Sequence, residues 1–433
     1  MTRRVLMITP HFPPDSSAAS HRVRLLAPHL ESAGWRPTVL TLTPDAYEGT
    51  LDPALARTVP ASLDVVRCRA WSAAVTRRFG VGDLGLRSFG ALRRGAIALL
   101  ERERYDVVYV TIYPTYPALL GPLLKRRFPV RFVLDYQDPW IGSWGLTVGG
   151  GPQAALDFKS RASRLVASWL EPIAVRAADA ITAVSERTYQ DVLARVPASP
   201  ACAALPLGWE CTDAELASTP NPFFDASDRR VNLCYVGTLL PNGFATLNAL
   251  LEALRLLRDR RPSQFDRVRL WFIGTSNQWR SDGELRVRPR ADALGLGDAV
   301  QEVAPRIGYA EALTVLRQSS GILMLGSSER HYTASKLYPA LLARHPIFAL
   351  FHADSTVVDI LRRAMAPPSA GIVTYCDTDP GVAPAVETVH TSLCAWLDRL
   401  DDTVRVDFAA IEDVSARALA HKLAAVMDQI GVN

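Results

Sequence analysis

One lysine stands at the start of an apolar, helix-like segment in HYTASKLYPALLARHPIFAL, His331 to Leu350. Unpaired backbone N–H groups make the first turn of a helix electropositive, so a lysine there is unfavourable unless an anion lies close by. Ser335 could cap this helix, which would put Lys336 in its first turn. An ammonium beside free N–H groups can bind a diphosphate and stabilise it as it departs. We therefore predict that Lys336 binds a diphosphate.

Two other loops have residue types that suit phosphate binding. The loop PHFPPDSSAASHRVRLL follows an apolar run, and the small residues around Ser17 would let a ligand approach the backbone. Arg22 would lie in the first turn of the next helix, where it either faces an anion or pairs with an acid of its own domain. Gly237 and Thr238 follow a later apolar run in the same way. These residues are candidate contacts of the same kind of ligand.

The elements that would position these residues alternate along the chain. Apolar runs without polar alternation are typical of strands buried on both faces of a parallel sheet. They occupy residues 4–9, 37–42, 105–110, 130–136, 179–185, 231–237, 268–274, 321–326, 346–351 and 371–376. Helical patterns lie between them, at 21–34, 86–103, 156–178, 186–195, 245–260, 309–319 and 335–344. The alternation predicts an α/β fold with parallel sheets.

The length of 433 residues predicts more than one domain. A segment rich in Pro, Ser, Asp and Gly, at 206–230, indicates the connection between two halves. We therefore expect two Rossmann-like domains, 1–205 and 206–413, whose parallel sheets face a central cleft. The last helix, at 414–430, is a candidate to pack back onto the first domain. In such sheets ligands bind beyond the carboxyl ends of the strands, where the loops described above lie.

Composition excludes some classes of protein and leaves others open. A net charge of +4 and 48% apolar residues are ordinary for a globular protein, and we expect no nucleic-acid partner. The segment 71–94 is rich in arginine, either as solvated surface or as a contact with anionic lipid. The six cysteines are scattered, and the sequence shows no signal peptide and no run of ~18–20 apolar residues. We therefore expect a cytoplasmic protein, which could also contact the inner membrane face peripherally.

Two matches to short motifs do not fit their structural context. Gly80–Gly85 reads G-x-G-x-x-G, but no buried strand precedes it, so we interpret it as a glycine loop rather than a dinucleotide site. Asp377-Thr378-Asp379 resembles the metal-binding motif of one class of sugar transferases, but no neighbouring acid or histidine completes a ligand shell. We interpret it as a turn, and we expect no metal and no cofactor.

Several segments together resemble the GT-B glycosyltransferases of family 4, in particular the members that build surface polysaccharides. They are FPPDSSAASHRVRLLAPHLESAGWRPTVLT, LDYQDPW, AADAITAVSE, YVGTL and SKLYPALLARHPIFAL, which span nearly the whole chain in the family's order. The resemblance implies a nucleotide sugar, with UDP- or GDP-sugar favoured, bound by the second domain and an acceptor bound by the first. It also implies transfer without a metal and favours retention of the anomeric configuration.

The resemblance assigns roles to particular positions. Lys336 would contact the diphosphate and act in catalysis, with Gly237 and Thr238 near the phosphates. Ser17 would face the donor, and Arg306 and Ile307 would lie near the base. The remaining candidate donor contacts are Arg22, Glu329 and Ser335.

The acceptor side is predicted around the end of the run 130–136. Asp138 would either position or deprotonate the acceptor hydroxyl, or would serve as a structural cap. Tyr136, Trp140 and Trp144 could stack on a sugar, or belong to the core. These alternatives cannot be separated by residue type.

Some positions depart from the family pattern. Where relatives carry two glutamates eight residues apart, this chain has His331 and Pro339, and Glu329 is out of register. Thr238 replaces a frequent arginine. The leading hypothesis is therefore a sugar transferase acting on a glycan, a lipid-linked acceptor or a small molecule. The alternatives are a degenerate GT-B protein that binds a nucleotide or a partner without transfer, and a sugar-nucleotide epimerase.

Overall fold

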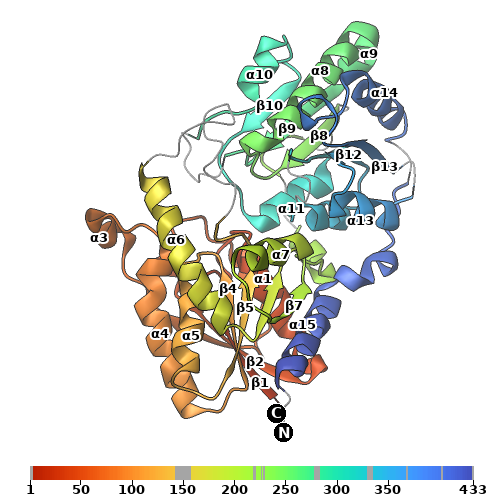
Figure 1. Ribbon diagram of the computed structural model, residues 1–433. Helices are drawn as coiled ribbons and strands as arrows, with labels where there is room; N and C mark the ends of the chain where they lie inside the picture. Colours follow the sequence, from red (N-terminus) through yellow and green to blue (C-terminus); the bar gives the residue numbers. More distant parts are fainter. Residues whose placement is uncertain are drawn as a thin grey trace. The chain divides into compact units, whose positions relative to one another are not determined.

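The computed structural model describes residues 3–141, 158–217, 221–225, 227, 230–276, 283–328, 335–366, 369–400 and 403–431. The chain forms two compact units. Unit 1 comprises Met1–Gly208 and Val414–Asn433, and unit 2 comprises Trp209–Asp413. Each unit contains one parallel sheet with helices packed against it (Figure 1). The predicted fold class, α/β with two Rossmann-like units, is confirmed.

Unit 1 is built on a seven-stranded sheet in the order β3-β2-β1-β4-β5-β6-β7, and every neighbouring pair is parallel. The strands are β1 (Arg3–Ile8), β2 (Trp35–Leu42), β3 (Asp64–Cys68), β4 (Val107–Ile112), β5 (Arg131–Tyr136), β6 (Ala180–Ala183) and β7 (Ala201–Ala204). The order reverses between β1 and β4. In sheets of this type, the reversal opens a crevice for ligands between the two loops that follow these strands.

Helices cover both faces of this sheet. They are α1 (Ser20–Leu26), α2 (Pro53–Ala56), α3 (Ala73–Thr76), α4 (Leu84–Arg102), α5 (Leu120–Lys125), α6 (Phe158–Ala177), α7 (Glu186–Arg195) and α15 (Ala416–Gly431). Side chains of α4, α5, α6 and α7 share one apolar core with the sheet, and side chains of α1 and α15 share the other. Helix α15 therefore completes unit 1 although it follows unit 2 in the chain.

Unit 2 has a six-stranded parallel sheet in the order β10-β9-β8-β11-β12-β13, with the reversal between β8 and β11. Its strands are β8 (Val231–Val236), β9 (Val268–Ile273), β10 (Val300–Val303), β11 (Gly321–Leu325), β12 (Ile347–His352) and β13 (Ala370–Tyr375). Its helices are α8 (Phe244–Arg260), α9 (Pro262–Phe265), α10 (Arg288–Ala293), α11 (Tyr309–Gln318), α12 (Leu337–Ala343), α13 (Thr356–Ala364) and α14 (Val386–Leu397). Helices α8, α10 and α14 share the larger core with this sheet.

The predicted strands are all present, and the helices differ mainly at their ends. The helix predicted at 21–34 is α-helical only over Ser20–Leu26 and continues as two short 3-10 turns, the first of which contains Pro28. The helix predicted from residue 335 begins at Leu337. No helix in the described part of the chain combines the length and the apolarity needed to cross a membrane.

Candidate functional site

Lys336 lies at the carboxyl edge of the unit 2 sheet, beside the reversal of strand order. It belongs to the connection between β11 and α12, and it reaches the connection that follows β8. Its Nζ donates to the hydroxyl of Tyr235 at 2.5 Å and to the carbonyl oxygen of Thr238 at 3.1 Å. The same nitrogen lies 4.3 Å from the centre of the Tyr235 ring. All of these partners are uncharged.

The charge of Lys336 is therefore not neutralised by the part of the protein that the structure describes. Burial lowers the pKa of Lys336 from its ordinary 10.5 to about 7, and no carboxylate of the described residues offsets that effect. A half-buried ammonium without a counterion is destabilised relative to its neutral form. An anion that bound beside Nζ would restore the charged form, so the geometry favours an anionic ligand.

Two glycines lie at this edge of the sheet, and one of them, Gly237, is directly beside Lys336. Gly237 has φ +128°, and a Cβ atom there would lie 3.3 Å from Cε and 3.4 Å from Nζ of Lys336. Gly274, with φ +76°, would place a Cβ atom 3.8 Å from the Cα atoms of Gly237 and Arg306. Both backbone conformations favour glycine. The structure thus brings Gly237, Arg306 and Lys336, from three distant segments of the chain, to one edge of the sheet, and their contacts with a donor stay predictions.

The other predicted donor contacts differ in their surroundings. Ser335 is half-buried and does not cap α12, because Lys336 itself occupies the N-cap position. Ile307 packs against a small core of Cys234, Ile273 and Val315. Glu329 lies outside the described residues. Tyr235, which holds Lys336, was missed by the sequence analysis because a buried strand tyrosine has the pattern of a core residue.

Arg22 does not contact a donor, and the prediction for this residue was wrong. Its side chain is 1% exposed and pairs with Asp135, through Nε to Oδ2 at 2.9 Å and Nη2 to Oδ1 at 3.0 Å. Its Nη1 also donates to the carbonyl oxygens of Leu205, at 2.5 Å, and Pro206, at 3.1 Å. The other option given by the sequence, an ion pair within its own domain, is therefore the one that the structure shows, because the side chain is buried against strand β5.

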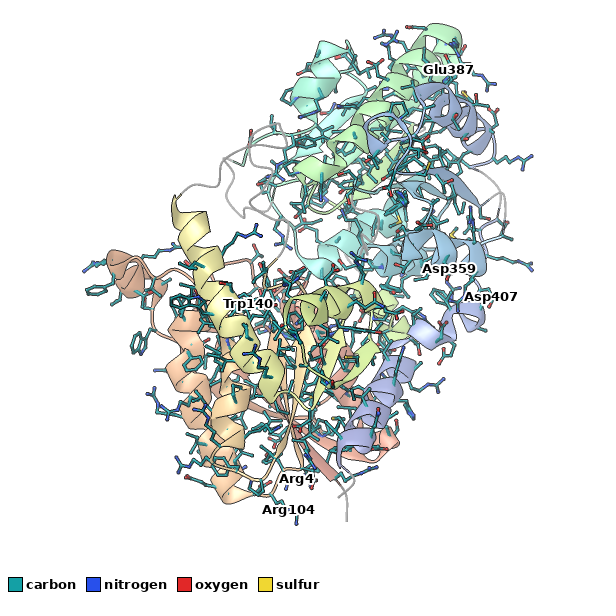
Figure 2. All side chains as sticks on the ribbon, in the orientation of Figure 1. Arg4, Arg104, Trp140, Asp359, Glu387 and Asp407 are labelled. Carbon is teal, nitrogen blue, oxygen red and sulfur yellow. The ribbon has the colours of Figure 1, made fainter. Side chains whose placement is uncertain are left out.

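Two of the three aromatic residues predicted to bind the acceptor are in the core. Tyr136 is 0% exposed and donates its hydroxyl to Glu171 at 3.2 Å, and burial raises its pKa well above the ordinary value. Trp140 (Figure 2) is 5% exposed and packs edge-on against Tyr116. Neither ring can stack on a sugar, so these two predictions are corrected. Trp144 lies outside the described residues.

Asp138 and Ser17 remain candidates at the carboxyl edge of the unit 1 sheet. Asp138 follows β5 and is exposed, yet the protein around it displaces enough water to raise the pKa of its carboxyl group to about 6. Ser17 is half-buried in the loop after β1, where its hydroxyl donates to Asp15 at 2.5 Å. The role of Ser17 at the donor stays a prediction.

The two rejected motifs have ordinary local structures. A 3-10 helix at Arg77–Phe79 precedes Gly80, and Asp83 caps α4 by accepting from the N–H of Leu86. Asp379 accepts from the N–H of Cys376 at 2.7 Å and closes a turn. Within the described ranges, no three His, Cys, Asp or Glu side chains gather as metal ligands would.

Comparisons with known proteins find one matching domain model and several similar structures. Residues 17–208 match the model of the glycosyl transferase 4-like domain. No curated protein matches the chain significantly in sequence. Among solved structures, sucrose-phosphate synthase from Thermosynechococcus elongatus is 16% identical with a TM-score of 0.60, over 99% of this chain and 98% of that one.

Two further solved structures are similar over the full length. The N-terminal domain of trehalose-6-phosphate phosphatase from Candida albicans has a TM-score of 0.64 at 13% identity, over 100% of this chain and 98% of that one. The UDP-forming trehalose-phosphate synthase from Burkholderia xenovorans has a TM-score of 0.61 at 12% identity, over 100% of both chains. Residues 17–208 thus resemble a glycosyl transferase 4-like domain, and the chain as a whole has the GT-B fold.

Proposed function

We propose that this protein is a glycosyltransferase that moves a sugar from a nucleotide-sugar donor to a hydroxyl group of an acceptor. The observation that carries the proposal is the ammonium of Lys336, which has only neutral partners at 2.5 and 3.1 Å in the described part of unit 2. A diphosphate supplies the missing negative charge. During transfer the diphosphate gains charge as it leaves, and Lys336 stabilises it.

The other side chains have distinct roles in this proposal. In unit 2, Gly237 and Thr238 border the phosphates, Arg306 and Ile307 the base, and UDP- or GDP-sugar is the donor. In unit 1, Asp138 holds the acceptor hydroxyl through a hydrogen bond. The acceptor is a glycan, a lipid-linked sugar or a small molecule, and the transfer is metal-independent and retaining. Transfer that persists in EDTA, with product of unchanged anomeric configuration, tests these last two features.

A thermal-shift screen against UDP, GDP, ADP and dTDP sugars tests the donor site. A ligand at 100 times its dissociation constant stabilises the folded protein by about 2.7 kcal/mol. We expect the sugars of one nucleotide to raise the melting temperature clearly, and we expect Lys336→Met to abolish this rise. Lys422→Met, at an exposed position of α15, is the matched control and keeps the shift. Equal shifts in all three proteins would remove Lys336 from the site.

A second candidate function is nucleotide binding without transfer. The departures at Pro339 and Thr238 favour it, because relatives place charged side chains at these positions. The two functions separate in one assay. If a nucleotide sugar raises the melting temperature of the protein, but the protein neither transfers the sugar to any acceptor tested nor hydrolyses the donor, it is a binding protein.

We also propose that unit 1 contacts a membrane on the cytoplasmic face, through an arginine–aromatic patch formed by Trp71, Val75, Arg77, Arg78 and Phe79. Helix α3 and the following 3-10 turn protrude at the left of unit 1 in Figure 1. Trp71, Val75 and Phe79 are 68%, 56% and 80% exposed. Apolar side chains flanked by arginines suit an anionic lipid surface.

Vesicle sedimentation tests this patch. We expect binding to vesicles with about 30% anionic lipid and none to neutral vesicles. Arg77→Ser with Arg78→Ser should weaken binding roughly 30-fold, because each arginine near the surface contributes about 1 kcal/mol. Arg102→Ser with Arg104→Ser is the control, since both arginines are exposed and Arg104 lies at the opposite end of unit 1 from α3 (Figure 2). Equal binding by both double variants would contradict the contact.

A further inference from the structure

Three stacked aromatic rings lie at the carboxyl edge of the unit 1 sheet, and the proposed roles do not use them. The imidazole of His11 stacks on the ring of Tyr47, with ring centres 6.0 Å apart, and on the ring of Tyr113, at 5.5 Å. The ring planes differ by 18° and 28°. The His11 side chain is 14% exposed, whereas Tyr113 is 46% exposed. Tyr113 is thus the ring of this stack that another molecule can reach.

Hydrogen bonds hold the two inner rings in place. Nδ1 of His11 lies 2.6 Å from Oδ2 of Asp15, and the hydroxyl of Tyr47 donates to the carbonyl oxygen of Pro10 at 3.0 Å. Tyr113 therefore packs against rings that cannot turn freely. A surface that is rigid before it binds loses little conformational entropy on binding, so its contacts contribute more to affinity.

The backbone at Tyr113 is strained. Its φ of +154° lies in a range that residues with a side chain rarely adopt. Strained residues persist where their surroundings fix them, and they concentrate at active sites and ligand contacts. The loop therefore holds this ring at the edge of the sheet although a relaxed backbone would be more stable, which is a second indication of function at Tyr113.

The stack lies where a ligand of this sheet is expected. His11 follows β1 and Tyr113 follows β4, the two strands between which the strand order reverses. Strand β5 pairs with β4, with Tyr136 opposite Ile112, so Asp138 follows the neighbouring strand end. The exposed ring and the candidate acceptor carboxylate therefore lie on the same edge of one sheet.

An aromatic ring and a carboxylate at one edge suit a sugar. A pyranose has hydroxyl groups around its rim and C–H groups on its two faces. The ionised carboxylate of Asp138 only accepts hydrogen bonds, which suits hydroxyl donors. The face of the Tyr113 ring carries partial negative charge and covers apolar surface, which suits the C–H groups. An open-chain alcohol offers only the first kind of contact, so the two side chains together select a ring.

We propose that Tyr113 is the platform on which a pyranose ring of the acceptor stacks, with His11 and Tyr47 as the rings that support it. This inference rests on the proposed sugar transfer and narrows the acceptor to a molecule whose reacting end is a sugar. That sugar either stands alone or ends a glycan or a lipid-linked chain. Tyr113 binds and orients the acceptor and takes no part in breaking or forming bonds.

Saturation-transfer NMR tests the platform without any donor. The probes are methyl β-glucopyranoside and methyl β-galactopyranoside, and sorbitol is the control ligand because it has hydroxyl groups but no ring. We expect saturation of the C–H protons of at least one pyranoside and none for sorbitol. Tyr113→Ala should abolish the signal, and Tyr113→Phe, which keeps the ring, should retain it. Trp169→Ala, at a 70% exposed position on α6, is the matched control and should also retain it.

Steady-state kinetics of sugar transfer test the same residue in the reaction. Tyr113→Ala should raise KM for the acceptor on the order of 10-fold, because an aromatic contact contributes up to about that factor to affinity. The values of kcat and of KM for the donor should stay close to those of the native protein, and Tyr113→Phe should restore the native KM for the acceptor. A purely structural role of Tyr113 would instead lower kcat and the donor-induced thermal shift together.

Each contrary result has its own meaning. If neither pyranoside gives a signal with the native protein, or if Tyr113→Ala keeps the signal, the platform is wrong whatever the transfer assay shows. If the native protein transfers sugar and Tyr113→Ala does so with unchanged KM for the acceptor, the platform is wrong and the proposed function stands. If the native protein transfers no sugar, yet Tyr113→Ala abolishes pyranoside binding, the proposed function falls, and Tyr113 is a sugar-binding residue rather than part of an acceptor site.

Discussion

Asp138 and Lys336 are ionisable side chains whose pKa values the protein shifts toward neutrality, to about 6 and about 7. Each follows a strand of its own unit, and in both cases the cause is the water that the surrounding protein displaces from the charged group. Shifts of this kind concentrate at functional sites, because catalysis and ligand binding need groups that change charge near the working pH. Near neutral pH, Lys336 is thus poised to gain a proton when an anion binds.

Asp138→Asn should stabilise the folded protein at neutral pH. The folded pKa of about 6 exceeds the ordinary 3.8, so the folded state holds more protons than the unfolded state between these values. Ionisation of Asp138 therefore lowers stability as the pH rises from about 4 to about 6, and the variant escapes this loss. Urea unfolding of the variant and of the native protein, at about pH 4 and at neutral pH, measures the difference in the free energy of unfolding. A variant less stable than the native protein at neutral pH would show that Asp138 is a structural cap instead.

Residue type alone predicted part of the candidate site in unit 2. A lysine before an apolar helix and a glycine after a buried strand are local signals, and the structure brings Lys336 and Gly237 together. Tyr136 and Trp140 could not be separated from core residues, because a tyrosine or tryptophan next to a buried strand suits either place.

Among the elements, α1 is tied to the sheet by the ion pair of Arg22 and Asp135. Thr182 on β6 also donates to Asp135, at 2.7 Å, while Arg22 bonds to the carbonyl oxygens that follow β7. Both charged side chains are 1% exposed or less. The pair thus links α1, β5 and β6 to the segment by which the chain leaves the first part of unit 1.

Arg22→Met should destabilise unit 1 by about 3–5 kcal/mol, because it leaves the carboxylate of Asp135 buried without a cation. Arg36→Met, on β2 at an exposed position, is the matched control and should change stability by less than about 0.5 kcal/mol. Chemical denaturation of both variants measures the two values. A small effect for Arg22→Met would mean that water or another group replaces the guanidinium.

Strands with long apolar runs were predictable, and three of the four edge strands were not. Strand β3 lies at one edge and is partly exposed, and β10 at the edge of the other sheet contains Gln301 and Glu302. Strand β7 contains only alanine and Cys202. Edge strands bury less surface, so their sequences lack the apolar run that indicates a central strand.

For the whole molecule, the chain leaves unit 1, forms unit 2 and returns to finish unit 1 with α15. Leu419, Leu423 and Met427 of α15 are buried in the core that covers one face of the first sheet. Trp35 Nε1 on β2 donates to Asp428 Oδ1 at 2.7 Å. The sequence predicted this helix, but which sheet it covers depends on contacts more than 200 residues apart in the chain.

Leu423→Ala should lower the free energy of unfolding by about 2–5 kcal/mol, because Leu423 is fully buried and its truncation would leave a cavity in the core. The adjacent Lys422→Ala lies on the exposed face of α15 and should have little effect. Hydrogen exchange should show faster opening in the strands of unit 1 than in those of unit 2. Equal acceleration in both units would contradict the assignment of α15 to unit 1.

The most direct test of the account is the pH dependence of nucleoside diphosphate affinity, measured by isothermal titration calorimetry between pH 7.5 and 9.5 with the nucleotide chosen by the screen. Lys336 has a pKa of about 7 in the free protein and must be protonated to bind the diphosphate, so affinity should fall on the order of 50-fold across this range. Lys336→Arg keeps its charge and should show almost no change. An affinity of the native protein that stays constant over the same range would contradict the central claim.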